Sequence, residues 1–120
     1  MKNKVWTVVI ARPLESAELV EIPASVNALH RIVGGDIECT YPLVDSMVVV
    51  SNEDGALLGM APNRLIFDED RPVDFYSGPM VILGVTEDGD FRSLTDAEKY
   101  VALDFYGLPH FQKVEDEEET

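Results

Sequence analysis

Cysteine and histidine are scarce in this sequence, which contains one cysteine and two histidines among 120 residues. The lone Cys39 cannot form an internal disulfide, and a single free cysteine is typical of a reducing compartment such as the cytoplasm. A cysteine nucleophile needs a neighbouring base, but Cys39 belongs to a strand that should pack, His30 to the polar side of a predicted helix, and His110 to the tail. We therefore expect no catalytic residues, and a protein that is not an enzyme.

Long apolar runs and cofactor motifs are missing as well. No stretch approaches the roughly 18 apolar residues that a membrane-spanning helix needs, and the apolar segment 5–11 ends too early for a signal peptide, so we predict a first strand there. The acidic segments 68–70 and 87–90 lack the alternating ligands of a calcium loop. No paired cysteines could bind zinc, and Gly34–Gly35 follow a predicted helix instead of preceding one, unlike a phosphate-binding loop. We expect no metal site and no cofactor.

Basic residues are few: nine lysines and arginines stand against 23 acids, for a net charge of −14. Five of the acids lie in residues 115–119, so most of the excess belongs to the rest of the chain. Such a surface repels nucleic acid phosphates and anionic lipid headgroups, and we expect neither direct nucleic acid binding nor membrane binding. It would attract a basic partner. The alternative is that the charge only keeps the protein soluble.

The hydrophobic pattern predicts a single α+β domain over residues 1–112, followed by an acidic disordered tail over 113–120. Capping residues and glycines place one helix between Ser25 and Gly34 and another between Thr95 and Gly107. The strands are expected to form a mainly antiparallel sheet flanked by these two helices. They are predicted over 5–11, 18–22, 37–41, 47–51, 56–60, 80–85 and 90–94.

Three local features of this prediction are specific enough to test. The turn 52–55 is expected to join the strands 47–51 and 56–60 into a hairpin. The segment 61–78, with its prolines and three consecutive acids, is expected to be a long irregular loop. The second helix is expected to turn four residues towards the core, namely Ala97, Tyr100, Val101 and Phe105.

Several short motifs between Ile32 and Leu94 suggest a family resemblance. They are Val33-Gly34-Gly35-Asp36-Ile37-Glu38, Asn52-Glu53-Asp54-Gly55, Leu58-Gly59, Pro62-Asn63-Arg64, Gly78, Ile82-Leu83-Gly84 and Ser93-Leu94-Thr95. Through them the chain resembles a small uncharacterised domain family of phages, plasmids and the bacteria that host them. The resemblance implies no activity. It favours a phage or mobile-element origin, and for small acidic proteins of that origin it suggests a role against host defences.

One set of polar residues in the middle of the chain could form a binding site. Asn52 and Glu53 precede the predicted strand 56–60, and Asn63 and Arg64 follow it, so both pairs could reach one end of the sheet if the chain doubles back. An arginine fork, two carboxamides and a carboxylate can recognise a phosphate together with a base or ribose edge. Tyr76 would complete the predicted ligand-binding set from the 61–78 segment. The structural alternative is that Asn52 shapes a turn and Arg64 pairs with an acid.

Two functions remain open, and neither is catalytic. In the first, which we place slightly ahead, the polar set binds and sequesters a small anionic ligand such as a signalling nucleotide in the host cytoplasm. In the second, the acidic surface imitates nucleic acid and docks on a basic host defence protein. Homo-oligomerisation is left open by the sequence.

Overall fold

The computed structural model, which describes residues 4–114, confirms the α+β prediction. The elements form one domain, and the predicted tail lies mostly beyond the described residues, so its disorder stays a prediction. In chain order the elements are β1 (Val5–Ala11), β2 (Glu18–Pro23), α1 (Val26–Val33), β3 (Ile37–Thr40), β4 (Met47–Asn52), β5 (Pro62–Asp68), β6 (Arg71–Ser77), β7 (Met80–Val85), β8 (Phe91–Arg92) and α2 (Asp96–Tyr106).

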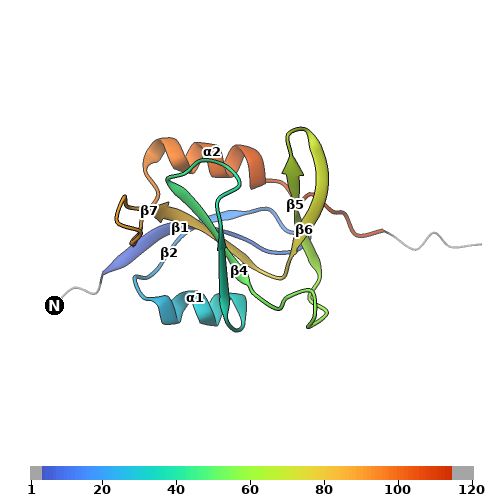
Figure 1. Ribbon diagram of the computed structural model, residues 1–120, viewed down its shortest axis with the longest axis horizontal. Coiled ribbons are helices and arrows are strands. Elements are labelled where there is room, and N and C mark those ends of the chain that lie inside the picture. Colours follow the sequence, from blue (N-terminus) through green and yellow to red (C-terminus); the bar gives the residue numbers. More distant parts are fainter. Residues whose placement is uncertain (1–3, 115–120) are drawn as a thin grey trace, which may run out of the picture.

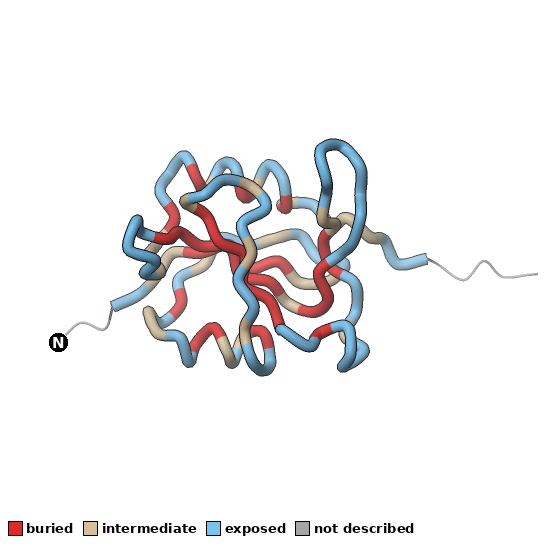
Figure 2. Tube along the Cα trace, viewed as in Figure 1, coloured by how far each residue is buried: buried red, intermediate tan, exposed pale blue. Residues whose placement is uncertain are grey.

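A six-stranded antiparallel sheet forms the middle layer of the domain. Its order is β2-β1-β7-β4-β3, with β8 paired to β7. Helix α1 covers one face, while α2 and the separate β5–β6 hairpin cover the other (Figure 1). Every residue of β4 and β7 is buried, and burial is concentrated in the central strands (Figure 2). These strands are central because they are almost continuously apolar and can face a core on both sides.

The predicted helix ends are confirmed by their caps. The Ser25 hydroxyl accepts a hydrogen bond from the Ala28 amide at 3.2 Å, and Gly34 ends α1 with a left-handed φ of 83°. At the start of α2, the Thr95 hydroxyl accepts from the Glu98 amide, and the Glu98 carboxylate accepts from the Thr95 amide. Both helices therefore begin where their capping residues indicated.

The predicted inward face of α2 is wrong. The buried residues of this helix are Glu98, Ala102 and Tyr106, whereas Tyr100 is 78% exposed. The prediction assumed that Glu98, as a charged residue, points to solvent, which is the usual arrangement in a surface helix. Here the Glu98 carboxylate instead binds Arg92 and Ser46 beneath the helix. The side of α2 that carries this partly buried ion pair therefore faces the sheet, and not the side that its apolar residues suggested.

The predicted hairpin of strands 47–51 and 56–60 is also wrong. Strand β4 already pairs with β3 on one side and β7 on the other, so neither edge is free to accept a returning strand. The chain forms a compact turn instead, in which the Leu58 amide donates to the Asp54 carbonyl at 2.9 Å and the Met60 amide to the Gly55 carbonyl at 3.0 Å.

The segment 61–78 is a hairpin and not the predicted irregular loop. Strands β5 and β6 pair through a two-residue turn at Glu69 and Asp70, where Glu69 has a positive φ of 58°. Such turns usually carry glycine or asparagine. Because neither residue type is present at 69–70, the sequence did not indicate a hairpin here. Pro62 begins β5, and Pro72 lies near the start of β6, where a missing amide donor is tolerated.

Candidate functional site

A polar groove of about 270 Å³ lies between the main sheet and the β5–β6 hairpin. Its walls come from β3, the end of β4, the following turn, and the facing sides of β5 and β6. The register between β3 and β4 places Glu38 opposite Ser51, on the same sheet face as the hairpin. Segments far apart in the sequence thus enclose one site.

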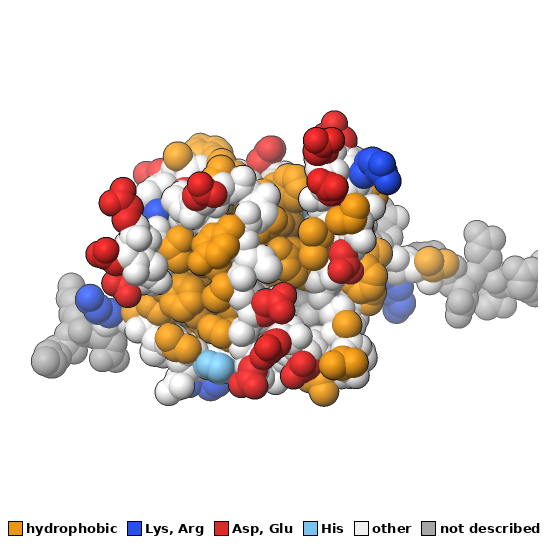
Figure 3. All heavy atoms as spheres, in the orientation of Figure 1, with side chains coloured by type: hydrophobic (Ala, Val, Ile, Leu, Met, Phe, Trp, Pro, Cys, Tyr) orange, Lys and Arg blue, Asp and Glu red, His pale blue; other side chains and the backbone are white. Residues whose placement is uncertain are grey.

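Three carboxylates line the groove. They belong to Glu38 on β3, Glu53 in the turn and Asp74 on β6, and no lysine or arginine is among the described residues that line the groove. No three acidic, histidine or cysteine side chains within residues 4–114 cluster closely enough to hold a metal ion. On the face shown in Figure 3, acidic side chains extend from the lower rim to the hairpin tip, and basic ones lie at the margins.

Hydroxyl groups line the groove beneath these carboxylates. Ser51 and Ser77 are only 4% and 8% exposed, and both line the groove. The Tyr76 hydroxyl is 2.7 Å from the Thr40 hydroxyl, and burial raises the pKa of Tyr76. A serine hydroxyl can accept a hydrogen bond, so the two serines add acceptor groups to the lining of the groove.

The turn after β4 forms one lip of the groove and is held in place by a close backbone contact. A Cβ atom on Gly55 would lie 2.6 Å from the Ser77 carbonyl oxygen, so only glycine lets the turn approach β6 this closely. Beyond it, Leu57 and Leu58 are 88% and 62% exposed. Two adjacent exposed leucines on an ordered turn form an apolar projection beside the acidic groove.

Three of the five predicted ligand-binding residues line this groove, namely Asn52, Glu53 and Tyr76. Asn52 also serves the fold, because its carboxamide accepts from the Asp54 amide at 2.8 Å and donates to the Val33 carbonyl at 3.1 Å. It thereby fixes the turn that carries Glu53 to the end of α1. The proximity of these residues comes from sheet pairing and the hairpin, since the strand 56–60 used to connect them does not exist.

The other two predicted ligand-binding residues, Asn63 and Arg64, lie away from the groove and are fully buried. The Arg64 guanidinium donates to the carbonyls of Tyr106, Arg12 and Glu15 and to the Asn63 carboxamide, at 2.8 to 3.1 Å. The Asn63 amide group donates to the carbonyls of Ala11 and Gly78, both at 2.8 Å. Arg64 therefore binds backbone carbonyls, and not an acid as the structural alternative assumed.

A comparison with protein-family models gives one match, and it includes the groove. Residues 5–103 match a family described as a domain of unknown function, DUF3846. The chain belongs to this family. No curated protein and no solved structure was found to match it. The matched range contains every strand, the groove and most of α2. Neither helix in residues 4–114 is long and apolar enough to cross a membrane.

Two further residues of this DUF3846 chain, Cys39 and His110, differ from their predicted environments. Cys39 is exposed because β3 is an edge strand, and partial burial of its sulfur, then Glu38, raise the pKa of the thiol. His110 packs against the rings of Phe67 and Phe105, and its Nδ1 accepts from the Leu65 amide at 2.9 Å. His110 is therefore part of the folded body and not of the tail.

Sequence reasoning missed most of the groove, although one signal was present. The alternation Ile-Glu-Cys-Thr over β3 puts Glu38 and Thr40 on one face of the sheet. Asp74 could not be found because β6 was not recognised as a strand. Ser51 and Ser77 lie in or beside apolar runs, where a serine carries no signal of its own.

The buried Tyr106 hydroxyl has no hydrogen-bond partner among the described residues, and burial followed by the nearby Tyr76 raises the pKa of Tyr106. An unpaired buried hydroxyl costs free energy. We expect Tyr106→Phe, which keeps the ring, to leave the free energy of unfolding unchanged or to raise it by about 1 kcal/mol. Chemical denaturation measures this, and a loss above about 1 kcal/mol would show that the hydroxyl is paired in solution.

Proposed function

We propose that this protein is a non-catalytic binding protein whose acidic groove accepts a cationic side chain of a partner protein. The observation that carries the proposal is the groove itself, whose lining combines three carboxylates and two serines with no lysine or arginine among the described residues. Ammonium and guanidinium groups bring only hydrogen-bond donors and a positive charge, which matches acceptors of this kind. The exposed ring of Phe75 at the rim adds an aromatic face for the cation.

The same features weigh against the small anionic ligand that the sequence placed slightly ahead. A phosphate in the groove would meet Glu38, Glu53 and Asp74 with no basic side chain beside it. All the N–H groups of Arg64, the arginine expected to bind the anion, are used by the fold. The volume of about 270 Å³ lies below the roughly 300–1,000 Å³ of typical small-molecule sites, which suits one side chain better than a nucleotide.

The exposed leucines favour a protein as the source of the cation over a free polyamine. Interfaces between proteins combine an apolar anchor with polar groups around it. Leu57 and Leu58 stand on the turn that forms the lip of the groove, so a basic surface docked on the groove would cover them as well.

The proposal includes a biological setting, supported by the resemblance of residues 32–94 to a family of phages and plasmids. In that setting the partner is a basic host defence protein in the cytoplasm, and occupation of its nucleic-acid-binding face by this acidic chain is a counter-defence. The overall charge of −14 supports this role because it accelerates association with a basic surface.

The experiment compares two triple variants that remove the same charge. We expect wild type to bind a hexalysine peptide, and Glu38→Gln/Glu53→Gln/Asp74→Asn to weaken binding at least tenfold in calorimetric titrations. The control, Glu87→Gln/Asp88→Asn/Asp90→Asn, changes exposed acids between β7 and β8, away from the groove, and should weaken binding less than threefold.

Equal losses in both triple variants would show that total charge, and not the groove, attracts the cation. A parallel titration with ATP tests the anionic-ligand hypothesis. Binding of ATP that raises the melting temperature would contradict the proposal, whereas no effect of ATP supports it.

A further inference from the structure

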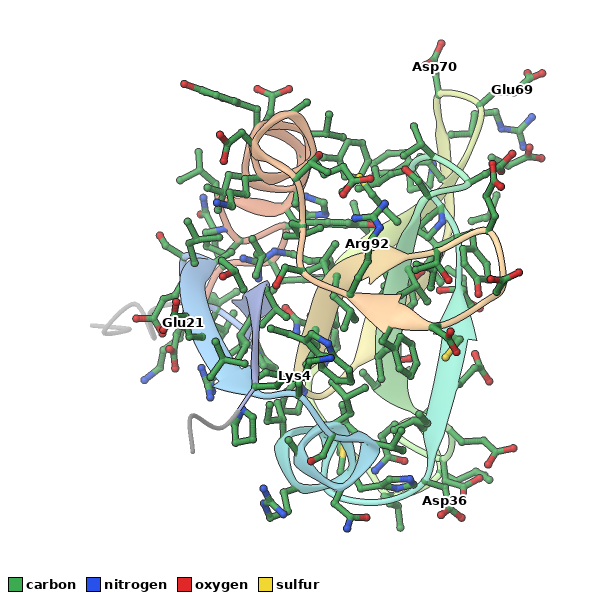
Figure 4. The ribbon with its side chains drawn as sticks, turned by 90° about the vertical axis from the view of Figure 1, so that its left-hand side faces the viewer. Lys4, Glu21, Asp36, Glu69, Asp70 and Arg92 are labelled. Carbon is green, nitrogen blue, oxygen red and sulfur yellow. The ribbon has the colours of Figure 1, made fainter. Side chains whose placement is uncertain are left out.

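Strand β3 is an open edge of the main sheet. It ends the strand order, and among residues 4–114 only β4 pairs with it. Figure 4 shows it at the outer margin of the sheet, starting near Asp36. Natural edge strands are commonly protected by shortness, charged side chains, proline or a bulge. Strand β3 is short, at four residues, and carries Glu38, but it contains no proline or lysine and pairs with β4 without a register shift. The opposite edge, β2, carries two glutamates and ends in Pro23.

The register shows which backbone groups of β3 point outwards. The Glu53 amide donates to the Asp36 carbonyl at 2.9 Å, so Asp36 faces β4. Because hydrogen bonding alternates along an antiparallel strand, Glu38 and Thr40 also face β4, and Ile37 and Cys39 face away. Within the described chain, no other backbone or side-chain group pairs with the amides and carbonyls of Ile37 and Cys39.

This edge lies directly beside the groove. Residues opposite one another on neighbouring strands share a sheet face, so a residue added opposite Glu38 would project towards Asp74 and the groove. On the outer edge, Glu38 occupies a non-hydrogen-bonded position, where opposing side chains come closest. Residues opposite Ile37 and Cys39 would project to the other face, next to exposed or half-buried apolar side chains.

We propose that β3 accepts an extended segment of the partner protein as an additional strand, with a lysine or arginine of that segment opposite Glu38 and inserted into the groove. The proposal rests on the proposed function and specifies how the partner binds. The backbone bonds to Ile37 and Cys39 provide affinity, and Glu38 with Asp74 selects the cation, as in other cases of strand addition. The expected partner pattern is apolar, basic, apolar.

Charge complementarity selects this occupant over a second copy of the chain. Pairing two β3 edges would bring together two chains of net charge −14, and would place the carboxylates of two Glu38 residues near the same edge. Like charges across neighbouring strands are destabilising. With a basic strand, Glu38 would instead face a lysine or arginine, and the interaction would be attractive.

The test uses amide hydrogen exchange measured by NMR with a peptide of alternating valine and lysine. In the free protein, we expect slow exchange at the Glu38 and Thr40 amides and fast exchange at Ile37 and Cys39. Saturating peptide should slow exchange at Ile37 and Cys39 at least tenfold. The variant Cys39→Pro removes only an outward amide, which an edge strand tolerates, and should weaken peptide binding at least tenfold.

Three other results would each contradict a specific part of the two proposals. If the peptide binds and the groove triple variant weakens it, but exchange at Ile37 and Cys39 stays fast, strand addition is wrong and groove docking stands. If the peptide does not bind, both proposals fail. If these amides become protected with rising protein concentration alone, and sedimentation shows a dimer that Cys39→Pro removes, a second copy is the occupant.

Discussion

Replacing Arg64 with methionine is expected to lower the free energy of unfolding by about 4 kcal/mol or more, the range reached by mutations that break a buried polar network. Methionine retains much of the volume but provides no donor. The carbonyls of Tyr106 and Glu15 then lose their side-chain partner inside the protein, and each such loss costs about 1–3 kcal/mol. Tyr106 ends α2, so its carbonyl is one that the helix itself leaves unpaired. Urea denaturation followed by circular dichroism measures the loss.

Arg71→Ala is the matched control for Arg64. Arg71 is exposed at the start of β6, and its removal should change stability by less than about 0.5 kcal/mol. The loss of stability in Arg64→Lys should fall between those of Arg64→Met and Arg71→Ala. An ammonium has three donors and cannot match the planar guanidinium fork. If Arg64→Met stayed within about 1 kcal/mol of wild type, the network would contribute little, and a role of Arg64 in ligand binding would have to be reconsidered.

Features encoded by neighbouring residues were predictable from the sequence. The caps at Ser25 and Thr95, and the buried strands β4 and β7, follow from short patterns and were predicted correctly. Features decided by distant contacts were not. Whether 52–60 forms a hairpin depends on β3 and β7 occupying both edges of β4, and no local pattern contains that information.

The candidate site shows the same division. Asn52 and Glu53 adjoin in sequence, and Tyr76 joins them only because β5 and β6 fold over the sheet. Arg64 was selected for the chemistry of its guanidinium, which suits phosphate and backbone carbonyls equally well. Only burial distinguishes these two uses, and burial depends on α2 ending above β5, 42 residues further along the chain.

A second buried charge, that of Glu98, ties α2 to the sheet. Arg92 bonds both carboxylate oxygens, at 2.7 and 3.0 Å, and the Ser46 hydroxyl donates to the same group at 2.6 Å. Arg92 reaches it across Gly84, where any Cβ would collide with the guanidinium. Figure 4 shows Arg92 between β8 and α2. The Arg92 hydrogen bonds are the largest cause that lowers the pKa of Glu98 from 4.5 to about 2.

This lowered pKa predicts how stability depends on pH. A carboxylate whose pKa falls on folding stabilises the protein above its unfolded value of 4.5, and the contribution disappears as pH falls through about 2. Allowing for the partial exposure of Arg92, we expect the contribution at pH 7 to be about 2–3 kcal/mol. Glu98→Gln should therefore destabilise the protein by about this amount at pH 7, and the difference from wild type should shrink steadily between pH 5 and pH 2.

The comparison of Glu98→Gln with wild type is informative because repulsion among the other acids changes with pH in both proteins and cancels in the difference. Glu87→Gln, an exposed change of the same kind in the turn before β8, should show no such pH-dependent difference. Guanidinium chloride denaturation at a series of pH values measures all three proteins at high ionic strength, where exposed charges are screened and the partly buried pair is screened less. A constant difference between Glu98→Gln and wild type from pH 7 to pH 2 would mean that Glu98 acts through packing and not through its charge.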